Sequence, residues 1–318
     1  MKSCWIVTDV GKIGTENQCI GLAEALGFIP EIKRIKPRSI WRLLPAAYWF
    51  NPLEGLSSSY DRLAPPWPDV IIAAGRASVA PTAKIRQLTQ GKTKVIQLQN
   101  PLVDPGLFDA VIAPQHDNLT GKNVIVTEGA LHRVTHERLS QEAHKFTSLV
   151  ASLPRPLVAV LIGGSNRCYK VKPEHMQRMG ERLKALCKQE GFGLAVTISR
   201  RTEPENRDVL VESLKDAPAI IWTGEGENPY FGFLGLADYI VVTCDSVSMT
   251  SEACFTGKPV YSYFFEGGSA KFKRFHAYFQ EKGYTKPFED NISSWSYAPL
   301  NDWQLVENNL KKLLKIDL

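Results

Sequence analysis

The chain has 318 residues, of which 44% are hydrophobic and 22% are charged, and its 38 lysines and arginines outnumber its 33 aspartates and glutamates. This composition is ordinary for a globular protein and argues against a disordered or fibrous chain. The length predicts two domains, because one domain usually holds about 100–200 residues. A net charge of +5 over such a length is too weak a field to indicate a nucleic-acid-binding protein.

The chain begins with a short β-branched run that Asp9 interrupts, which predicts a first strand and not a secretory signal. No apolar stretch approaches the ~20 residues that a membrane span needs. The six cysteines form no CxxC pair, so neither a disulfide framework nor a zinc site is indicated. We therefore expect a cytoplasmic protein with reduced thiols, no metal and no obligatory cofactor.

In the first half, short β-branched runs alternate with longer amphipathic stretches, as is typical of βα units that build a parallel sheet. The predicted strands are Cys4–Thr8, Glu31–Ile35, Val70–Ala74, Val95–Leu98, Ala110–Ala113 and Val124–Val126. The predicted helices are Glu16–Leu26, Ser39–Trp49 and Ser78–Leu88.

A new period starts after the segment 151–156, which contains Pro154 and Pro156 and can neither continue a helix nor join a central strand. The predicted strands of the second half are Leu157–Ile162, Leu194–Ile198, Ala219–Trp222, Tyr239–Val242 and Val260–Tyr263. The predicted helices are Glu174–Gln189, Asn206–Ser213, Tyr230–Leu236, Val247–Phe255, Phe272–Lys282 and Trp303–Lys315.

These elements predict an α/β fold with two Rossmann-like domains whose parallel sheets face each other across a cleft. The expected domains are residues 1–153 and 154–302, and the terminal helix 303–315 is expected to pack back on the first. Because ligands of open α/β sheets bind outside the carboxyl ends of the strands, the residues after each strand are the candidates for function.

The familiar nucleotide motifs are absent. Gly11 and Gly14 lack the third glycine of GxGxxG, and Gly91-Lys92-Thr93 lacks the leading glycine of a P-loop and precedes a strand. No Asp-x-Asp pattern or His/Cys/Glu cluster has the spacing of metal ligands. A simple NAD enzyme, a P-loop NTPase and a metal-dependent site are therefore not supported.

Three strand ends of the second half carry candidate phosphate contacts. Gly163, Gly164 and Ser165 follow one strand, and paired glycines let backbone N–H groups approach a phosphate; an ordinary turn uses the same residues. Arg200 and Arg201, with Ser199, follow the next strand, where guanidinium groups suit a diphosphate or simply a solvated turn. Gly224 opens a third loop that would wrap a nucleobase or cap a helix.

The fourth strand end is the most specific. A buried strand runs into a polar turn and a helix whose first N–H groups form a ready anion site, with Ser248 and Met249 in its first turn. Asp245 or Ser246 is the predicted N-cap. Glu252 lies within about two turns of the helix start, where a carboxylate can accept hydrogen bonds from ribose hydroxyls.

This strand, turn and helix, closed by Gly257-Lys258-Pro259, resemble the donor half of glycosyltransferases with two Rossmann domains, the GT-B type. The peptidoglycan N-acetylglucosaminyl transferase is one of these. The resemblance implies that Glu252 binds ribose and that Gly163–Ser165 and the helix start at Ser246–Met249 approach the diphosphate. Cys244 departs from the pattern, since an acidic or small polar residue is expected there.

A second resemblance covers nearly the whole chain. Residues 9–27, 75–76, 99–101, 114–117, 123–124, 129–131, 199–202 and 228–230 are similar to the "elongated mitochondria" fission-factor family. The family's plant members help to recruit a dynamin-related protein to mitochondria. Its bacterial members, which this chain resembles more in its compactness, are commonly labelled nucleoside-diphosphate-sugar epimerases or glycosyltransferases.

Polar residues of the first domain are candidates for the acceptor side. His116 after a strand is a candidate general base with Asp117 as its orienting carboxylate, although a loop histidine is more often structural. Contacts to acceptor or phosphate are expected from helix and strand ends, where the same residues would otherwise cap helices: Gly14, Asn17, Gln18 and Arg76.

The segment 33–50 mixes cations with aromatic and aliphatic residues, a composition typical of a membrane interface and also of a helix that covers a sheet.

From the residues and the resemblances together we expect a GT-B-type glycosyltransferase. It would transfer a sugar from a nucleotide-diphosphate donor in the second domain to a lipid-linked or envelope glycan acceptor in the first. We expect it to act at the inner face of a membrane, and we do not expect it to bind nucleic acid. Two alternatives stay open, an NDP-sugar epimerase on the same fold and a non-catalytic adaptor of the fission-factor type, because fold analogy does not separate them.

Overall fold

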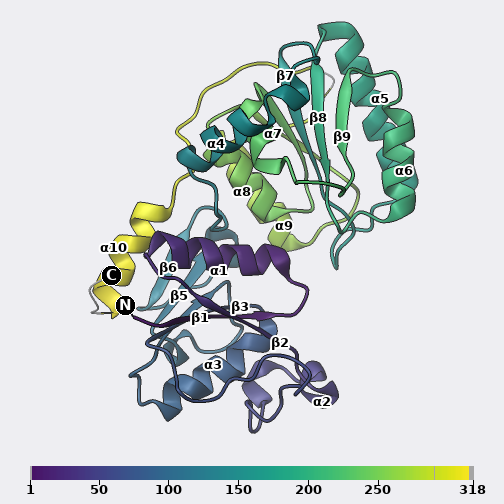
Figure 1. The fold of residues 1–318 in the computed structure, drawn as a ribbon. Coiled ribbons are helices and arrows are strands. Elements are labelled where there is room, and N and C mark those ends of the chain that lie inside the picture. Colours follow the sequence, from purple (N-terminus) through teal and green to yellow (C-terminus); the bar gives the residue numbers. More distant parts are fainter. Residues whose placement is uncertain (1, 290, 315–318) are drawn as a thin grey trace. The chain divides into compact units, whose positions relative to one another are not determined.

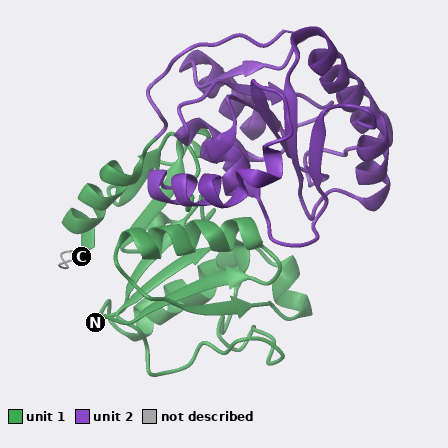
Figure 2. Ribbon diagram, turned by 45° about the horizontal axis from the view of Figure 1, so that its top comes forward, with its two compact units in different colours: residues 1–133, 301–318 green, residues 134–300 purple. Residues whose placement is uncertain are grey.

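The computed structural model describes residues 2–289 and 291–314, and these residues form two compact units. Unit 1 holds the chain up to residue 133 together with the segment from residue 301, and unit 2 holds residues 134–300 (Figure 2). Each unit contains one six-stranded sheet, and the paired strands are parallel. The predicted α/β class with two parallel sheets is confirmed.

The sheet of unit 1 has the strand order β2-β1-β3-β4-β5-β6 (Figure 1). Its strands are β1 (Cys4–Asp9), β2 (Glu31–Ile35), β3 (Val70–Ala74), β4 (Lys94–Leu98), β5 (Ala110–Pro114) and β6 (Val124–Thr127). Its helices are α1 (Ile13–Ala25), α2 (Ser39–Leu43), α3 (Arg76–Leu88) and α10 (Trp303–Leu314), with short 3-10 turns at η1 (Ala46–Tyr48), η2 (Pro105–Leu107) and η3 (Gln115–Asp117).

Helices cover both faces of this sheet. Successive side chains of a strand point to opposite faces, so neighbouring residues of β1 pack against different helices. Ile6 of β1 belongs to the same core cluster as Leu22 of α1 and Leu310 of α10. Its neighbour Val7 belongs to a second cluster with Ile85 of α3. The terminal helix is thus part of the core of unit 1, although Lys315, the last residue predicted for that helix, lies outside the described residues.

The sheet of unit 2 has the order β12-β11-β10-β7-β8-β9 (Figure 1). Its strands are β7 (Leu157–Ile162), β8 (Gly193–Ile198), β9 (Ala219–Trp222), β10 (Tyr239–Thr243), β11 (Val260–Tyr263) and β12 (Thr285–Pro287). Its helices are α4 (His136–Phe146), α5 (Pro173–Glu190), α6 (Pro204–Ser213), α7 (Tyr230–Leu236), α8 (Val247–Phe255) and α9 (Ala270–Glu281), and η4 (Ser148–Val150) is a 3-10 turn.

Adjacent residues of β7 again enter two different cores. Val160 belongs to a cluster with Met179 of α5, whereas Leu161 belongs to a cluster with Phe233 of α7 and Phe275 of α9. A strand buried on both sides reads as a continuous apolar run, which is why β7 was recognisable from its sequence.

The two units divide between residues 133 and 134, whereas the sequence predicts a boundary between 153 and 154. The reason is α4, a helix missing from the predicted elements, which packs against α7. Two glycines of α7 allow the close approach, since a Cβ on Gly235 would lie 2.6 Å from the Leu139 carbonyl oxygen and a Cβ on Gly232 would lie 2.7 Å from Phe146. These contacts attach the segment before the two prolines to unit 2.

Two local predictions are wrong in detail. The helix predicted over Ser39–Trp49 is split into α2 and η1, because Leu44 precedes Pro45 and takes an extended conformation with ψ of 139°. The strand β12 was not predicted, since three residues that end in a proline carry no strand pattern. In the part of the chain that the structure describes, no helix has both the length and the apolar character required to cross a membrane.

Both sheets have a topological switch point. In unit 1 the chain places β2 on one side of β1 and β3 on the other, so the switch point lies between β1 and β3. In unit 2 the chain places β8 on one side of β7 and β10 on the other, so it lies between β7 and β10. Ligands of open α/β sheets bind outside the strands' carboxyl ends at such points.

Candidate functional site

The turn between β10 and α8 lies at the switch point of unit 2. The Ser246 hydroxyl caps α8 by accepting a hydrogen bond from the Met249 backbone N–H at 3.3 Å. Of the two predicted caps, Ser246 therefore fills the role. Asp245 has a different one.

The Asp245 carboxylate is fully buried and is bonded from three directions. It accepts hydrogen bonds from the Gly164 N–H at 3.0 Å and the Thr243 hydroxyl at 2.7 Å. Arg201 forms an ion pair with it, with 2.7 Å between Nη2 and Oδ2. A buried carboxylate is tolerated when it is paired and hydrogen-bonded, and this one ties together the ends of β7, β8 and β10.

The glycine turn after β7 is closed by the same group. The N–H of Gly163 donates to Thr243 Oγ1 at 2.8 Å, and the N–H of Gly164 donates to Asp245. The sequence assigns Gly163–Ser165 to a diphosphate, whereas in the structure both glycine N–H groups are engaged within the protein. Glycine is required here sterically: a Cβ on Gly163 would lie 2.2 Å from the Asp245 oxygens, and one on Gly164 would lie 2.2 Å from the Arg201 carbonyl oxygen.

The neighbouring serines also bond internally. Ser165 Oγ accepts a hydrogen bond from the Val171 N–H at 3.0 Å, and Ser199 Oγ accepts one from the Arg201 N–H at 3.2 Å. These two hydrogen bonds stabilise the loops that follow β7 and β8.

The two adjacent arginines differ. Arg201 is committed to the protein's own groups, since it also donates to the Gly164 carbonyl oxygen at 3.2 Å. Arg200 is exposed and forms no hydrogen bond or ion pair with any residue in 2–289 or 291–314. Of the predicted pair, Arg200 is therefore the cation that is available to a ligand.

Glu252 lies on α8 and is partly buried. Its carboxylate accepts a hydrogen bond from the Tyr230 hydroxyl, which comes from the first residue of α7. Burial raises the pKa of Glu252 to about 7, and the hydrogen bond from Tyr230 opposes that rise. Near neutral pH this side chain therefore exchanges between a carboxyl group that donates and a carboxylate that only accepts.

The loop before α7 is exposed. Gly224 has φ of +112°, a conformation that L side chains rarely adopt, and no atom lies within 4 Å of the place where its Cβ would be. The Asn228 side chain accepts a hydrogen bond from the Tyr230 N–H at 3.0 Å and so positions the start of α7.

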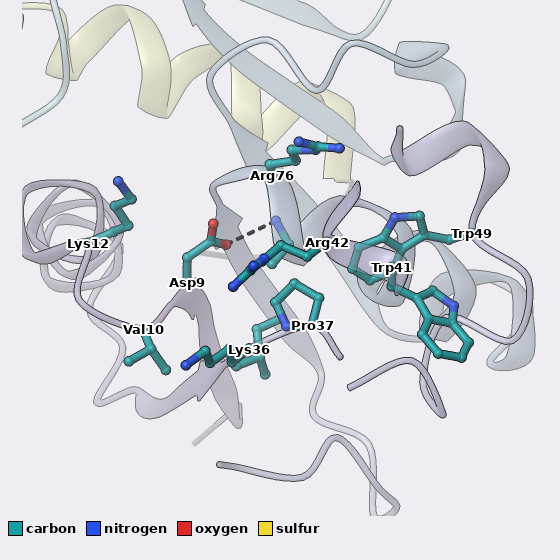
Figure 3. Close-up of a pocket in the computed structure, with 11 residues that line it drawn as sticks. Asp9, Val10, Lys12, Lys36, Pro37, Trp41, Arg42, Trp49 and Arg76 are labelled. Carbon is teal, nitrogen blue, oxygen red and sulfur yellow. Dashed lines mark hydrogen bonds between the residues drawn. The ribbon is translucent and has the colours of Figure 1, made fainter. Parts of the chain in front are cut away.

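The residues predicted to contact an acceptor lie at different depths in unit 1. Gly14 is exposed in the first turn of α1, and Asn17 is partly buried on the same helix. Gln18 is buried, and its Oε1 accepts a hydrogen bond from Gln99 Nε2 at 3.1 Å. Arg76 opens α3 and lines a pocket (Figure 3).

His116 and Asp117 form a buried pair in η3. Their side chains are 3% and 1% exposed, and His116 Nε2 lies 3.8 Å from Asp117 Oδ1. Asp117 also accepts a hydrogen bond from the Asn100 N–H at 3.2 Å. A general base has to come within hydrogen-bond reach of the substrate proton, so catalysis by His116 stays a prediction that this buried position does not favour.

Three residues outside the predicted site also shape the site in unit 2: Thr243, Tyr230 and His276. His276 Nε2 lies 2.8 Å from the Cys244 carbonyl oxygen, and burial lowers the pKa of this histidine. Cys244 itself is bonded from the other side, since its Sγ accepts a hydrogen bond from the Phe265 N–H at 3.3 Å. Thr243 is recognisable as a neighbour of Asp245, and Tyr230 lies within the family-like residues 228–230, whereas His276 reaches the site from α9 and carries no signal for this role in the sequence.

Among residues 2–289 and 291–314, no three histidine, cysteine, aspartate or glutamate side chains lie close enough to hold a metal ion together. The polar groups of the unit 2 site are instead suited to hydrogen bonding and to balancing the charge of an anion.

Comparisons with known proteins identify both the family and the fold. The family described as "Mitochondrial fission ELM1" matches residues 13–314. A relative from Arabidopsis thaliana, the mitochondrial fission protein ELM1, is 33% identical over 274 residues, which cover 78% of this chain. The chain spans only 64% of that relative's length.

Two solved structures share the fold over nearly the whole chain. The UDP-GlcNAc 2-epimerase from Neisseria meningitidis, in a structure bound to UDP-GlcNAc, matches with a TM-score of 0.52 and 13% identity, covering 98% of this chain and 100% of that chain. MurG from Acinetobacter baumannii matches with a TM-score of 0.51 and 14% identity, covering 98% of this chain and 92% of that one. The fold is therefore GT-B-like, as the first resemblance implied.

Proposed function

The chain belongs to the mitochondrial fission ELM1 family, and on that premise we propose that it is a glycosyltransferase that takes a sugar from a nucleotide-diphosphate donor. The donor binds at the switch point of unit 2, and the acceptor, a lipid-linked or envelope glycan, binds to unit 1. The proposed location is the cytoplasm, at the inner face of a membrane.

The observation that carries this proposal is the position of Glu252 on α8. Ser246 caps this helix, which begins at Val247 shortly after β10 at the switch point, and the carboxylate lies on the same helix beside Tyr230. As a carboxylate it can accept hydrogen bonds from both hydroxyls of a ribose, which is what a nucleotide-binding glutamate does. A fold neighbour that was solved with UDP-GlcNAc supports a nucleotide sugar as the ligand class.

The reaction joins the acceptor oxygen to the anomeric carbon of the sugar, while the bond from that carbon to the diphosphate breaks and the nucleoside diphosphate leaves. Negative charge develops on the diphosphate, and an exposed guanidinium such as that of Arg200 offsets it without a metal. The acceptor hydroxyl loses its proton to a base, for which the sequence proposes His116.

An NDP-sugar epimerase is the second candidate, and the match to the Neisseria epimerase favours it. The two activities differ in what they need, because an epimerase changes the free nucleotide sugar while a transferase needs an acceptor. Analysis of the nucleotide sugar after incubation without acceptor therefore separates them.

Calorimetric titration of the full chain with UDP-, GDP-, ADP- and CMP-sugars tests the proposal. We expect one of these to bind, and we expect Glu252→Gln to weaken it roughly tenfold, because a neutral amide accepts less strongly than a carboxylate. Glu205→Gln is the matched control, since Glu205 is exposed on α6. Binding that Glu252→Gln leaves unchanged contradicts the ribose role. If no nucleotide sugar binds, the enzyme proposal fails and the adaptor, which the Arabidopsis relative's name favours, replaces it.

A further inference from the structure

A pocket of about 240 Å³ lies in unit 1 beside the switch point between β1 and β3 (Figure 3). Its lining comes from three neighbouring strand ends: Asp9 ends β1, Lys36 follows β2, and Arg76 follows β3 through Gly75. The pocket is smaller than the ~300–1,000 Å³ usual for sites that enclose a drug-sized ligand, so it suits a small group and not a whole nucleotide sugar.

The pocket carries an excess of positive charge, since four cations and one carboxylate line it. The carboxylate of Asp9 accepts a hydrogen bond from the Ala77 N–H at 3.0 Å, shown as the dashed line in Figure 3. None of the four cations pairs with a carboxylate in the described part of the chain, whereas Arg34 on β2 pairs with Glu16 at 2.7 Å. Figure 3 shows the four cations around Asp9: Lys12, Lys36, Arg42 and Arg76.

Neighbouring groups position two of these cations without neutralising them. Arg76 Nη2 donates to the Leu44 carbonyl oxygen at 2.8 Å. Lys36 lies over the ring of Tyr60, with Nζ 5.3 Å from the ring centroid. Such contacts reduce the conformational freedom that a ligand would otherwise have to remove, and they leave the positive charges unbalanced.

Trp41 and Trp49 form the apolar wall of the pocket (Figure 3). The indole N–H of Trp49 donates to the Leu44 carbonyl oxygen at 3.0 Å, and that of Trp41 donates to the Phe50 carbonyl oxygen at 2.9 Å. Both rings are therefore anchored to the backbone of residues 39–50, which hold α2 and η1 and are called the α2–η1 segment. A fixed apolar wall beside unpaired cations strengthens the attraction for an anion, because it keeps water away from one side.

We propose that this pocket binds a phosphate or diphosphate group, held by Arg42, Arg76 and the two lysines. This inference rests on the proposed function, since it makes the acceptor of the transfer a phosphorylated molecule. The phosphate could belong to a soluble ester or to a lipid headgroup, and both present the same oxygens to the four cations.

The surface next to the pocket shows how a lipid source would be recognised. The α2–η1 segment, which supplies Arg42 and both tryptophans, also exposes large apolar side chains. Their exposed fractions are 53% for Ile40, 78% for Leu43, 71% for Tyr48 and 58% for Phe50. Apolar side chains beside cations are typical of a surface that contacts anionic lipid.

The test measures binding of inorganic pyrophosphate to the full chain by calorimetry. We expect binding that Arg42→Gln weakens roughly tenfold, which is what the loss of one charge-assisted contact produces. Lys122→Gln is the matched control, because it removes one charge from an exposed loop of unit 1 outside the pocket. The proposal is overturned if pyrophosphate does not bind, or if both variants weaken its binding equally, unless a second experiment with lipid vesicles shows binding that depends on Arg42.

The lipid arm uses vesicles of phosphatidylcholine with and without phosphatidic acid. A lipid phosphate is identified if the protein sediments only with vesicles that contain phosphatidic acid, and if both Arg42→Gln and Leu43→Ser abolish this sedimentation. A soluble ester is identified if the protein does not bind vesicles and Leu43→Ser leaves pyrophosphate binding intact. If neither arm depends on Arg42, the pocket is not a phosphate site. Nucleotide-sugar binding to the same variants is measured in parallel, so that failure in unit 2 is distinguished from failure of this pocket.

Discussion

At the switch point of each unit, an aspartate carboxylate accepts a hydrogen bond from a backbone N–H in the turn after a neighbouring strand. In unit 1 the carboxylate of Asp9 accepts the Ala77 N–H at 3.0 Å, and a Cβ on Gly75 would lie 2.8 Å from it. In unit 2 the carboxylate of Asp245 accepts the Gly164 N–H at 3.0 Å and lies against the preceding glycine. Each aspartate therefore ends or follows one strand and closes the turn of the neighbouring strand.

The difference lies in what neutralises each carboxylate. Asp245 is buried and paired with Arg201, so its charge is balanced within unit 2. Asp9 is only partly buried; burial raises its pKa, while the nearby charges of Lys12 and Arg76 lower it without forming an ion pair. A carboxylate at a switch point can therefore balance a cation of the protein itself, as in unit 2, or leave nearby cations without an ion pair, as in unit 1.

The largest effect is expected from Gly164→Ala. The new Cβ would lie 2.2 Å from the Arg201 carbonyl oxygen, a backbone atom with little freedom to move, so we expect a loss of about 3 kcal/mol in the free energy of unfolding. Gly14→Ala is the control, since no atom lies within 4 Å of its Cβ position. Urea unfolding measures both, and an equal response of the two variants would contradict the closed turn in unit 2.

The next effect separates the two aspartates directly. Asp245→Ala leaves the Gly164 N–H and the Thr243 hydroxyl without their buried acceptor, so we expect a loss of about 2–3 kcal/mol. Asp9→Ala removes one hydrogen bond to a backbone N–H and should cost about 1 kcal/mol. If Asp9→Ala lowers the free energy of unfolding more than Asp245→Ala does, the different roles inferred for the two aspartates are wrong.

A smaller effect concerns pH and Glu252. Its pKa is raised to about 7 in the folded protein, so between its ordinary value and 7 the folded state binds more protons than the unfolded chain. The free energy of unfolding should therefore fall as pH rises through this window, with a slope of at most about 1.4 kcal/mol per pH unit, and Glu252→Gln should abolish this fall. Tyr230→Phe removes the hydrogen bond that lowers this pKa and should move the fall to higher pH. Unfolding curves recorded across the window decide the matter; parallel curves for wild type and Glu252→Gln would refute the assignment.

The smallest effect compares two arginines. Arg201→Gln leaves the Asp245 carboxylate without its cation, and because Arg201 is 42% exposed we expect a loss of only about 1 kcal/mol. Arg42→Gln should change the free energy of unfolding by less than about 0.5 kcal/mol, since Arg42 is exposed and has no ion pair among the described residues. A thermal-unfolding comparison in which Arg42→Gln is the more damaging variant would show that Arg42 has a structural role.

Much of the fold could be predicted from local patterns. The apolar run of β7 and the strand, turn and helix from Tyr239 to Phe255 appear where the sequence places them, because burial on both faces of a parallel sheet leaves an unambiguous apolar signal. The helix α4 was missed, since Leu139 is its only buried residue and its apolar stripe is correspondingly thin. Its partner glycines on α7 make sense only once the two helices are in contact.

The candidate site was predictable in its location and less so in its bonding. Ser246 as a cap follows from local rules, because a cap bonds to a residue three positions away. The acceptors of the Gly163 and Gly164 amides are 80 and 81 residues away in sequence, so no local pattern shows that these groups are already engaged. The burial of His116 in η3 likewise arises only in the folded chain.

Local patterns are enough to predict two α/β units, the residues that follow the strands and the family that the chain resembles, because apolar periodicity and turn residues act over short distances. Which of those strand-end groups bond to one another depends on the fold. Hydrogen bonds and ion pairs depend on distances between segments remote in sequence, and those distances left Asp245 paired with Arg201 in unit 2 and four cations unpaired around Asp9 in unit 1.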